Sequence, residues 1–400
     1  MKSPLTIVIV LLALLGSALC ACSQPDDEEL DRSPESQAIP LLPGGVAIYG
    51  VSSPAAAPNA KHIWFQTNTD GEFKKELREG SYNPRLTRWV GCDVALMRDD
   101  TIEVHNPCSG EVKNIKVDST ATGMLDGFVS PNKKFIALFS YVRGGNAVFL
   151  SDGENTVSSP HPIYSTDVLV TDAGDMYSLE KDWEAPEGKP PGFCTYNMSI
   201  SSPSLQQQCL LLGEGRTFSF GAFSLLDGIP HLFVVWYDDE GAGWSLYRRE
   251  HSDWAKVNDK HAFPLNPEVH GHAGQPFVRS GNLYMLTDTP GFVRIPFPTQ
   301  ETTELGFEFT SLESLITGQR VSVTRDGNLI NYVFFRDENL GAGQYLSSFN
   351  IDDPTASVGP WRIPPELLTG TGYNSFQAID SIFINDESTR TKLGAEPLTP

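Results

Sequence analysis

The sequence predicts an all-β protein. Short runs rich in β-branched and aromatic residues alternate with Gly, Pro, Asn and Asp turns along most of the chain. The 35 glycines and 29 prolines indicate that turns are frequent. No long stretch keeps the apolar spacing of three and four residues that an amphipathic helix needs. Short helical turns are expected only at 311–317 and 364–369, and clear strands at 62–68, 134–142, 231–237, 283–288 and 329–335.

One strand–turn–strand unit recurs along the chain. Successive copies lie about 40 to 55 residues apart, which is the length of a four-stranded propeller blade. Radial closure of such blades leaves only short edges, so it accommodates many strands without long open sheets. We therefore expect a β-propeller over 43–386 with seven blades, six and eight being the alternatives. The copies are 128–140, 169–180, 225–236, 277–287 and 322–335, with a looser copy at 89–104.

Two of the copies carry a recognisable motif. The segment 128–137, FVSPNKKFIA, resembles the WD40-like repeat of TolB-type β-propellers, in which an apolar residue and Ser-Pro-Asp-Gly-Lys precede an apolar strand. The segment 323–330, VTRDGNLI, is similar to the same turn. Asn132-Lys133 replaces the Asp-Gly of the pattern, and Thr324-Arg325 replaces the Ser-Pro. The resemblance implies a propeller that docks protein or peptide partners in the bacterial cell envelope.

The N-terminus predicts export and lipid anchoring. The apolar run from Leu5 to Leu15 is too short for a membrane span, which needs about 20 residues, and is typical of a signal peptide at 1–21. Leu19-Cys20-Ala21-Cys22 resembles a bacterial lipobox, which implies lipidation of Cys22; the alternative is an ordinary signal with an incidental cysteine. Ser23 after the cysteine implies the outer membrane, with the periplasmic or surface face left open. Residues 22–42 predict an acidic flexible tether, and 387–400 a polar C-terminal tail.

The charge of the chain restricts its partners. The formal net charge is -21, which disfavours nucleic acid and anionic headgroups and permits cationic partners or divalent metal ions. The predicted contact with a membrane is therefore through the lipid anchor alone.

Four cysteines remain after the signal and the lipidated Cys22, and an oxidising compartment favours disulfides between them. A three-residue loop centred on Asp100 places Cys92 opposite Cys108, and a two-residue turn at Ser201-Ser202 places Cys194 opposite Cys209. Opposed residues of a hairpin lie about 4.5–5.5 Å apart, within disulfide reach. We expect two local disulfides; the alternative is four free buried thiols.

An aromatic cluster is the strongest candidate for a binding site. Exposed Tyr and Trp rings stack on sugars and anchor protein interfaces. Because the cluster flanks a predicted hairpin turn, packing of these rings in the core is the competing interpretation. Arg248 and Arg249 follow it and can face an anionic ligand or balance neighbouring carboxylates. The residues of the cluster are Trp236, Tyr237, Trp244, Tyr247 and Trp254.

Two segments are candidate metal sites, for zinc or calcium respectively; no other cofactor is expected. His270 and His272 alternate, so both imidazoles can share an ion with His261 or Glu268. The acidic turn 238–240, formed by Asp238, Asp239 and Glu240, offers oxygen ligands that suit calcium. The competing interpretations are solvated surface histidines and a plain acidic hairpin tip.

The catalytic motifs sought are absent from the sequence. There is no Gly-x-Ser-x-Gly elbow, no phosphate-binding Gly loop, no Cys-x-x-Cys and no His-Glu-x-x-His, which disfavours an enzyme. The sequence favours a lipid-anchored envelope docking protein that uses a β-propeller to bind a protein or peptide. The alternatives are an envelope carbohydrate-binding protein or polysaccharide-active enzyme, and a metal-dependent structural lipoprotein.

Overall fold

The computed structural model describes residues between Gly45 and Pro397. The described residues belong to the unit Ala38–Pro400. They omit 52–60, 69–72, 80–93, 99–100, 107–110, 117–120, 133, 143–144, 162–164, 181–189, 262, 264–275, 288–289, 317–318, 337–342, 364–377 and 385. The expected signal peptide, Cys22 and tether therefore lie outside the described residues. Among those described, no helix is long and apolar enough to cross a membrane.

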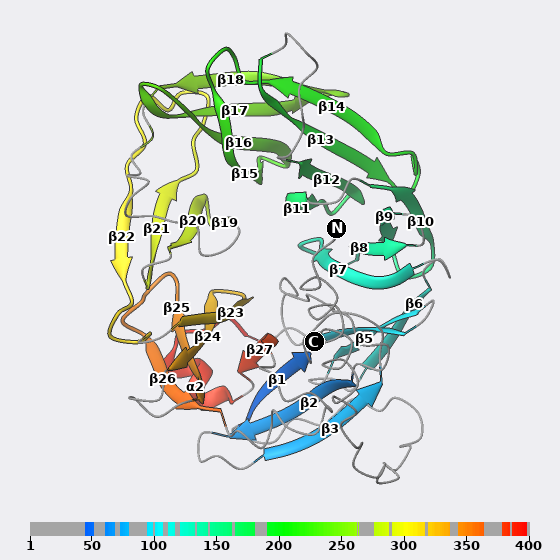
Figure 1. The fold of residues 1–400 in the computed structure, drawn as a ribbon, viewed down its shortest axis with the longest axis vertical. Coiled ribbons are helices and arrows are strands. Elements are labelled where there is room, and N and C mark those ends of the chain that lie inside the picture. Colours follow the sequence, from blue (N-terminus) through cyan, green and yellow to red (C-terminus); the bar gives the residue numbers. More distant parts are fainter. Residues whose placement is uncertain are drawn as a thin grey trace, which may run out of the picture. The chain divides into compact units, whose positions relative to one another are not determined.

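The described part of the chain is an all-β propeller, as the repeats predicted. Five blades are antiparallel sheets of four consecutive strands (Figure 1). The first two are β7–β10 (Ala121–Val129, Ile136–Val142, Gly145–Ser151, Thr156–Pro160) and β11–β14 (Ser165–Val170, Asp175–Glu180, Gly192–Ser199, Gln206–Leu211). The others are β15–β18 (Thr217–Leu226, Ile229–Asp238, Gly241–Glu250, Asp253–Lys260), β19–β22 (Phe277–Arg279, Asn282–Thr287, Gly291–Pro296, Glu308–Ser311) and β23–β26 (Gln319–Asp326, Leu329–Arg336, Gly343–Asn350, Ser357–Arg362).

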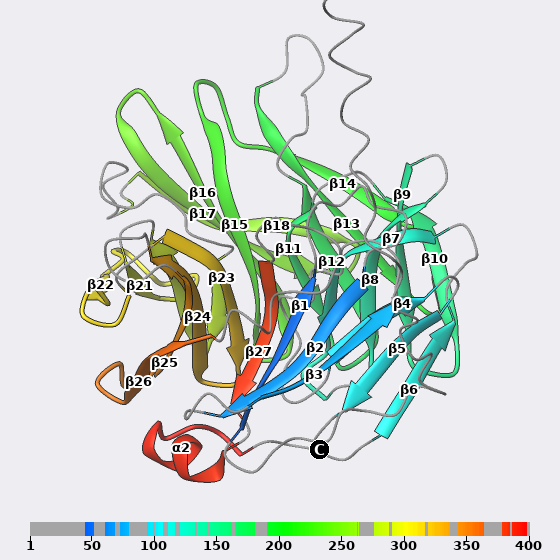
Figure 2. The ribbon, with the colours of Figure 1, turned by 60° about the horizontal axis from the view of Figure 1, so that its bottom comes forward.

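Two further sheets are built differently, which corrects the expectation of seven equivalent blades. One is ordered β27-β1-β2-β3, so the C-terminal strand lies beside the N-terminal one (Figure 2). Its strands are Gly45–Val51, Lys61–Asn68, Phe73–Glu79 and Ala378–Ile384. The other has three described strands, β4–β6, at Val94–Arg98, Thr101–Asn106 and Glu111–Lys116. Dividing the chain length by a blade length assumed equal blades. That assumption is wrong here, because five sheets in the described part of the chain repeat the four-strand pattern, rather than seven, six or eight.

The repeated sequence unit is the first hairpin of each of these five blades. In four blades its turn contains a left-handed backbone: Gly174 (φ 85°), Asp227-Gly228 (φ 51° and 75°), Ser280-Gly281 (φ 47° and 71°) and Gly327 (φ 60°). Such turns match the twist of paired strands. In the SPNKK copy, Ser130 Oγ instead accepts a bond from Phe135 N (3.0 Å). The turn residues therefore determine where each blade starts.

The core lies between neighbouring blades. Four apolar clusters each combine side chains from two successive blades, from β7–β10 through to β23–β26. The first strands of adjacent blades also contact one another. At one of these contacts the buried carboxylate of Asp167 on β11 accepts a bond of 2.7 Å from Phe223 N on β15. Each blade is thus stabilised by its neighbours rather than by a core of its own.

The expected polar tail differs from the structure. Helix α2 (Glu387–Lys392) begins after Asp386, whose side chain caps Thr389 N. Leu393 is fully buried, and Asn350 donates a bond of 2.9 Å to its carbonyl. Because the segment is polar in sequence yet anchored by hydrogen bonds from β25, composition alone did not reveal that it packs.

Candidate functional site

The predicted aromatic cluster lies in blade β15–β18, and its rings are in the core. Trp236 and Trp244 are 0% exposed, Tyr247 2% and Trp254 5%, while Tyr237 is half-buried. Trp244 faces blade β19–β22, whereas Trp236, Tyr247 and Trp254 face blade β11–β14. The core-packing interpretation therefore applies, and exposed ring faces for a sugar are not present at these four residues.

A polar cluster covers the buried indole of Trp236. The guanidinium of Arg216 lies over the ring, 3.6 Å from its centroid. Trp236 Nε1 donates to Ser245 Oγ at 3.0 Å, so the buried indole is satisfied. Gly243 leaves the space for the ring, because a Cβ there would stand 2.2 Å from it. We use the name β16–β17 cluster for Arg216, Trp236, Gly243, Ser245, Asp238, Lys256, Asp259 and His261.

Arg216 is fixed by Asp259. Its Nη1 lies 2.9 Å and 3.2 Å from the two carboxylate oxygens and also donates to the carbonyl of Leu212. Lys256 Nζ approaches the same carboxylate at 3.2 Å. Burial alone raises the pKa of Asp259, but the hydrogen bond from Arg216 and the charge of Lys256 outweigh it and hold the pKa below its usual value. The carboxylate therefore stays ionised beside two cations.

The acidic turn forms a local cap. Asp238 Oδ1 accepts bonds from Glu240 N and Gly241 N, at 3.0 Å and 3.2 Å. His261 Nε2 lies 2.9 Å from the same oxygen and 3.7 Å from the Glu240 carboxylate. No group of three or more metal-ligating side chains occurs among the described residues. Asp239 lies in the same turn; the candidate ligands Glu268, His270 and His272 lie outside the described residues.

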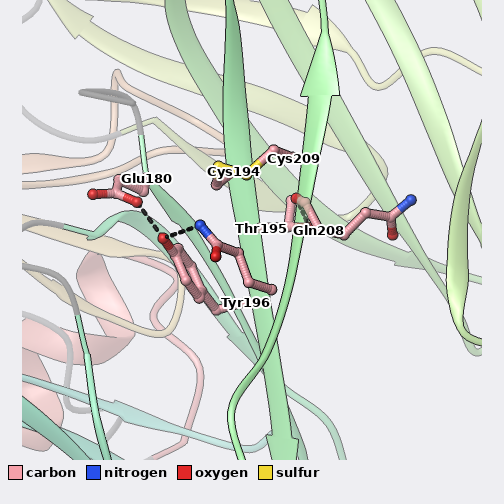
Figure 3. The surroundings of a disulfide bond; sticks show 7 residues. Glu180, Cys194, Thr195, Tyr196, Gln208 and Cys209 are labelled. Atoms are coloured by element: carbon pink, nitrogen blue, oxygen red, sulfur yellow. Dashed lines mark hydrogen bonds between the residues drawn. A yellow bond between two sulfur atoms is a disulfide. The ribbon is translucent and has the colours of Figure 1, made fainter. Parts of the chain in front are cut away.

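One predicted disulfide is confirmed (Figure 3). Cys194 on β13 and Cys209 on β14 are directly opposed, with Cα atoms 4.0 Å apart. The register is the expected one, but the connection is longer than a two-residue turn: Ser199 and Ser202 close a tight turn, and β14 starts only at Gln206. Cys92 and Cys108 lie outside the described residues. The hairpin between them pairs Arg98 with Thr101, one residue away from the register that was predicted.

A tyrosine network beside the disulfide was not found from the sequence. Tyr196 Oη donates to Glu180 Oε2 at 2.5 Å and accepts from Gln207 Nε2 at 2.9 Å (Figure 3). Burial, together with the Glu180 carboxylate, raises the pKa of Tyr196. The phenol therefore stays protonated and links β12, β13 and β14. The three residues come from three strands, so no sequence spacing could identify them.

A buried Ser–His pair joins two neighbouring blades: His161 follows β10, and Ser178 lies on β12. His161 Nε2 and Ser178 Oγ are 2.8 Å apart. The His161 ring also contacts Phe139 and Tyr196, and both members of the pair are buried. Although this distance resembles that of a nucleophile and its base, the hydroxyl is enclosed by packed rings and is not accessible to a substrate.

Sequence comparison finds no matching protein-family model and no matching curated protein. Structural comparison finds similar chains at low identity. A hypothetical selenium-binding protein from Sulfolobus tokodaii is 11% identical with a TM-score of 0.45, covering 86% of this chain and 94% of that one. The β-propeller domain of the Trilobed protease from Pyrococcus furiosus is 11% identical with a TM-score of 0.33, covering 76% and 83%. An acylaminoacyl peptidase from Pyrococcus horikoshii is 11% identical with a TM-score of 0.33, covering 75% and 44%.

Proposed function

We propose that this chain is a lipid-anchored docking protein of the bacterial cell envelope, whose propeller binds a protein or peptide partner. The observation that carries the proposal is the β16–β17 cluster. Charged side chains are held there in fixed positions over a buried tryptophan, at one end of blade β15–β18. Lipid anchoring rests on the lipobox-like sequence at Cys22.

The geometry of the cluster suits a protein partner. Arg216 has already lost its side-chain freedom to Trp236, Asp259 and Leu212, so binding a partner costs little further ordering. Arginine is among the residues that most often dominate protein interfaces. Glu240, 83% exposed, stands beside His261 at the same turn and supplies a charged rim.

The carbohydrate alternative is supported less well. It depended on exposed aromatic faces, and the tryptophans of the predicted cluster are enclosed between blades. The polysaccharide-active enzyme is also supported less well, because the Glu180 carboxylate that lies near a tyrosine is hydrogen-bonded to it within the blade.

A matched pair of charge reversals tests the proposal. Glu240 and Glu154 both stand at hairpin tips, and each backbone N–H is capped by the aspartate two residues earlier, at 3.0 Å and 2.9 Å. The full lipoprotein, with Glu240→Lys or Glu154→Lys, serves as bait for crosslinking in its own envelope, followed by mass spectrometry. We expect wild type and Glu154→Lys to capture the same envelope protein and Glu240→Lys to lose most of it. Failure of wild type to capture any protein would refute the docking function.

A further inference from the structure

Among the sheets that the structure describes, the outer edge is protected in all cases but one. We call the last strand of each sheet, remote from the strand that contacts the neighbouring blade, its outer-edge strand (Figure 1). Open edges recruit other chains, and proteins block them with charges or proline. Six outer-edge strands carry a charge, a proline or both: FKKELRE (β3), EVKNIK (β6), TVSSP (β10), DWAKVNDK (β18), EFTS (β22) and SVGPWR (β26). The outer-edge strand β14, QQQCLL, has neither.

The backbone of β14 presents alternate residues away from its sheet. Leu212 N donates to Pro191 O at 2.9 Å, and the ladder pairs Leu210 with Phe193. Because hydrogen-bonded pairs alternate along an antiparallel ladder, the N–H and C=O groups of Gln207, Cys209 and Leu211 point outward. Within the described part of the chain, no strand pairs with this side of β14.

β14 is also held rigidly. Cys209 is bonded to Cys194, and Gln207 donates to the Tyr196 hydroxyl. On the opposite face, Gln208 Oε1 accepts from Trp254 N of the next blade at 3.1 Å. Three consecutive side chains are therefore fixed. β14 itself carries no charged side chain, and Arg249 of the next blade reaches Gln208 Oε1 at 3.4 Å. Fixed geometry lowers the entropy cost of adding another strand.

We infer that β14 is a docking strand, on which an extended, positively charged segment of a partner protein adds as a fifth strand of the blade. The inference rests on the proposed docking function and names the surface and the partner chemistry. Leu211, 43% exposed, offers an apolar contact at one end of the strand. Glu214 stands in the loop that follows β14, after Leu212 and Gly213, and the whole chain has a formal net charge of -21. These charges attract a cationic segment and repel a second copy of this chain.

The probe is a synthetic peptide of alternating Thr and Val flanked by lysines, titrated into the purified full chain. Two control peptides carry glutamate flanks or N-methyl groups on alternate backbone nitrogens. The test variant is Leu211→Pro, which removes an outward-pointing N–H that makes no hydrogen bond to β13. Its matched control is Leu211→Ala, which keeps that N–H. Circular dichroism confirms that both variants keep the native strand signal.

We expect the lysine-flanked peptide to bind and to slow hydrogen exchange of segment 206–212. Leu211→Pro should weaken binding about tenfold more than Leu211→Ala, equivalent to about 1.4 kcal/mol, and N-methylation should abolish it. Equal binding by the two variants, equal binding by the glutamate-flanked peptide, or protection confined to another segment overturns the inference. The inference is also overturned if the wild-type chain forms a dimer and Leu211→Pro dissociates it, because β14 would then bind a second copy of this chain.

Crosslinking in the envelope separates this inference from the docking function. If wild type captures an envelope protein and Leu211→Pro captures it equally, the β14 assignment is wrong although the docking function stands. If wild type captures none, the docking function itself is wrong. Loss of the captured protein in Leu211→Pro but not in Leu211→Ala supports the inference when the peptide results agree.

Discussion

Removing the Cys194–Cys209 disulfide should destabilise the protein by a predictable amount. The bridge joins residues 15 apart in sequence, across strands that are already paired. In the loop-closure model, a crosslink of this span lowers the entropy of the unfolded chain enough to stabilise the fold by about 3 kcal/mol at 25 °C. The double variant Cys194→Ala/Cys209→Ala is therefore expected to lose about that much free energy of unfolding.

Urea unfolding followed by tryptophan fluorescence measures the loss. The double variant is preferable to a reductant, because a reductant also acts on Cys92 and Cys108. Trp236 and Trp254 pack against blade β11–β14, so their emission reports on the blade that carries the bridge. If the double variant unfolds within about 1 kcal/mol of wild type with an unchanged urea slope, the entropic reasoning is refuted.

Three further outcomes follow from single contacts. Gly243→Ala should displace the Trp236 ring and cost more than about 1 kcal/mol, seen as a shift of the urea midpoint and of the emission maximum. Leu393→Ala should cost about 2–5 kcal/mol in the same assay, because the side chain is fully buried; a loss below about 1 kcal/mol would mean that the C-terminal segment does not pack. Folding lowers the pKa of Asp259 below its usual 3.8. The ion pair between Asp259 and Arg216 should therefore stabilise the fold at pH values above 3.8, and this stabilisation should disappear as the pH falls through the pKa of the folded chain. Urea midpoints of wild type and Asp259→Asn should accordingly differ at neutral pH and converge in acid; a constant difference would contradict this.

The features that the sequence predicted correctly are local ones. The turns at 227–228, 280–281 and 326–327 need residues that tolerate a left-handed backbone, and such residues are visible in the sequence. All five copies of the repeat coincide with first hairpins, and the copy at 128–140 closes through the Ser130 hydroxyl instead of a left-handed turn. The register of Cys194 and Cys209 was also predicted correctly, whereas the β4–β5 register was one residue off, because Arg98 pairs with Thr101 rather than with Ile102.

The features that the sequence could not predict depend on distant residues. Trp236 is buried because the preceding blade, β11–β14, covers its face of strand β16. The amino-acid composition of β16 would be the same if that face were exposed to solvent. Arg216 stands in a loop ahead of β15, and no spacing relates it to Asp259 on β18. Helix α2 is too short and polar to show an amphipathic pattern, and it is fixed by Asn350.

The pairing of β27 with β1 determines when the protein can finish folding. Val46 is paired with Ile384, so the sheet that contains β1 needs a strand that is synthesised only after all five blades of consecutive strands. Blades β7–β10 to β23–β26 consist of consecutive strands and can assemble as each emerges, but β1–β3 must wait. Contacts between residues so distant in sequence form slowly. A chain truncated before Ala378 would therefore leave an open edge at its N-terminal strands, and such edges promote aggregation.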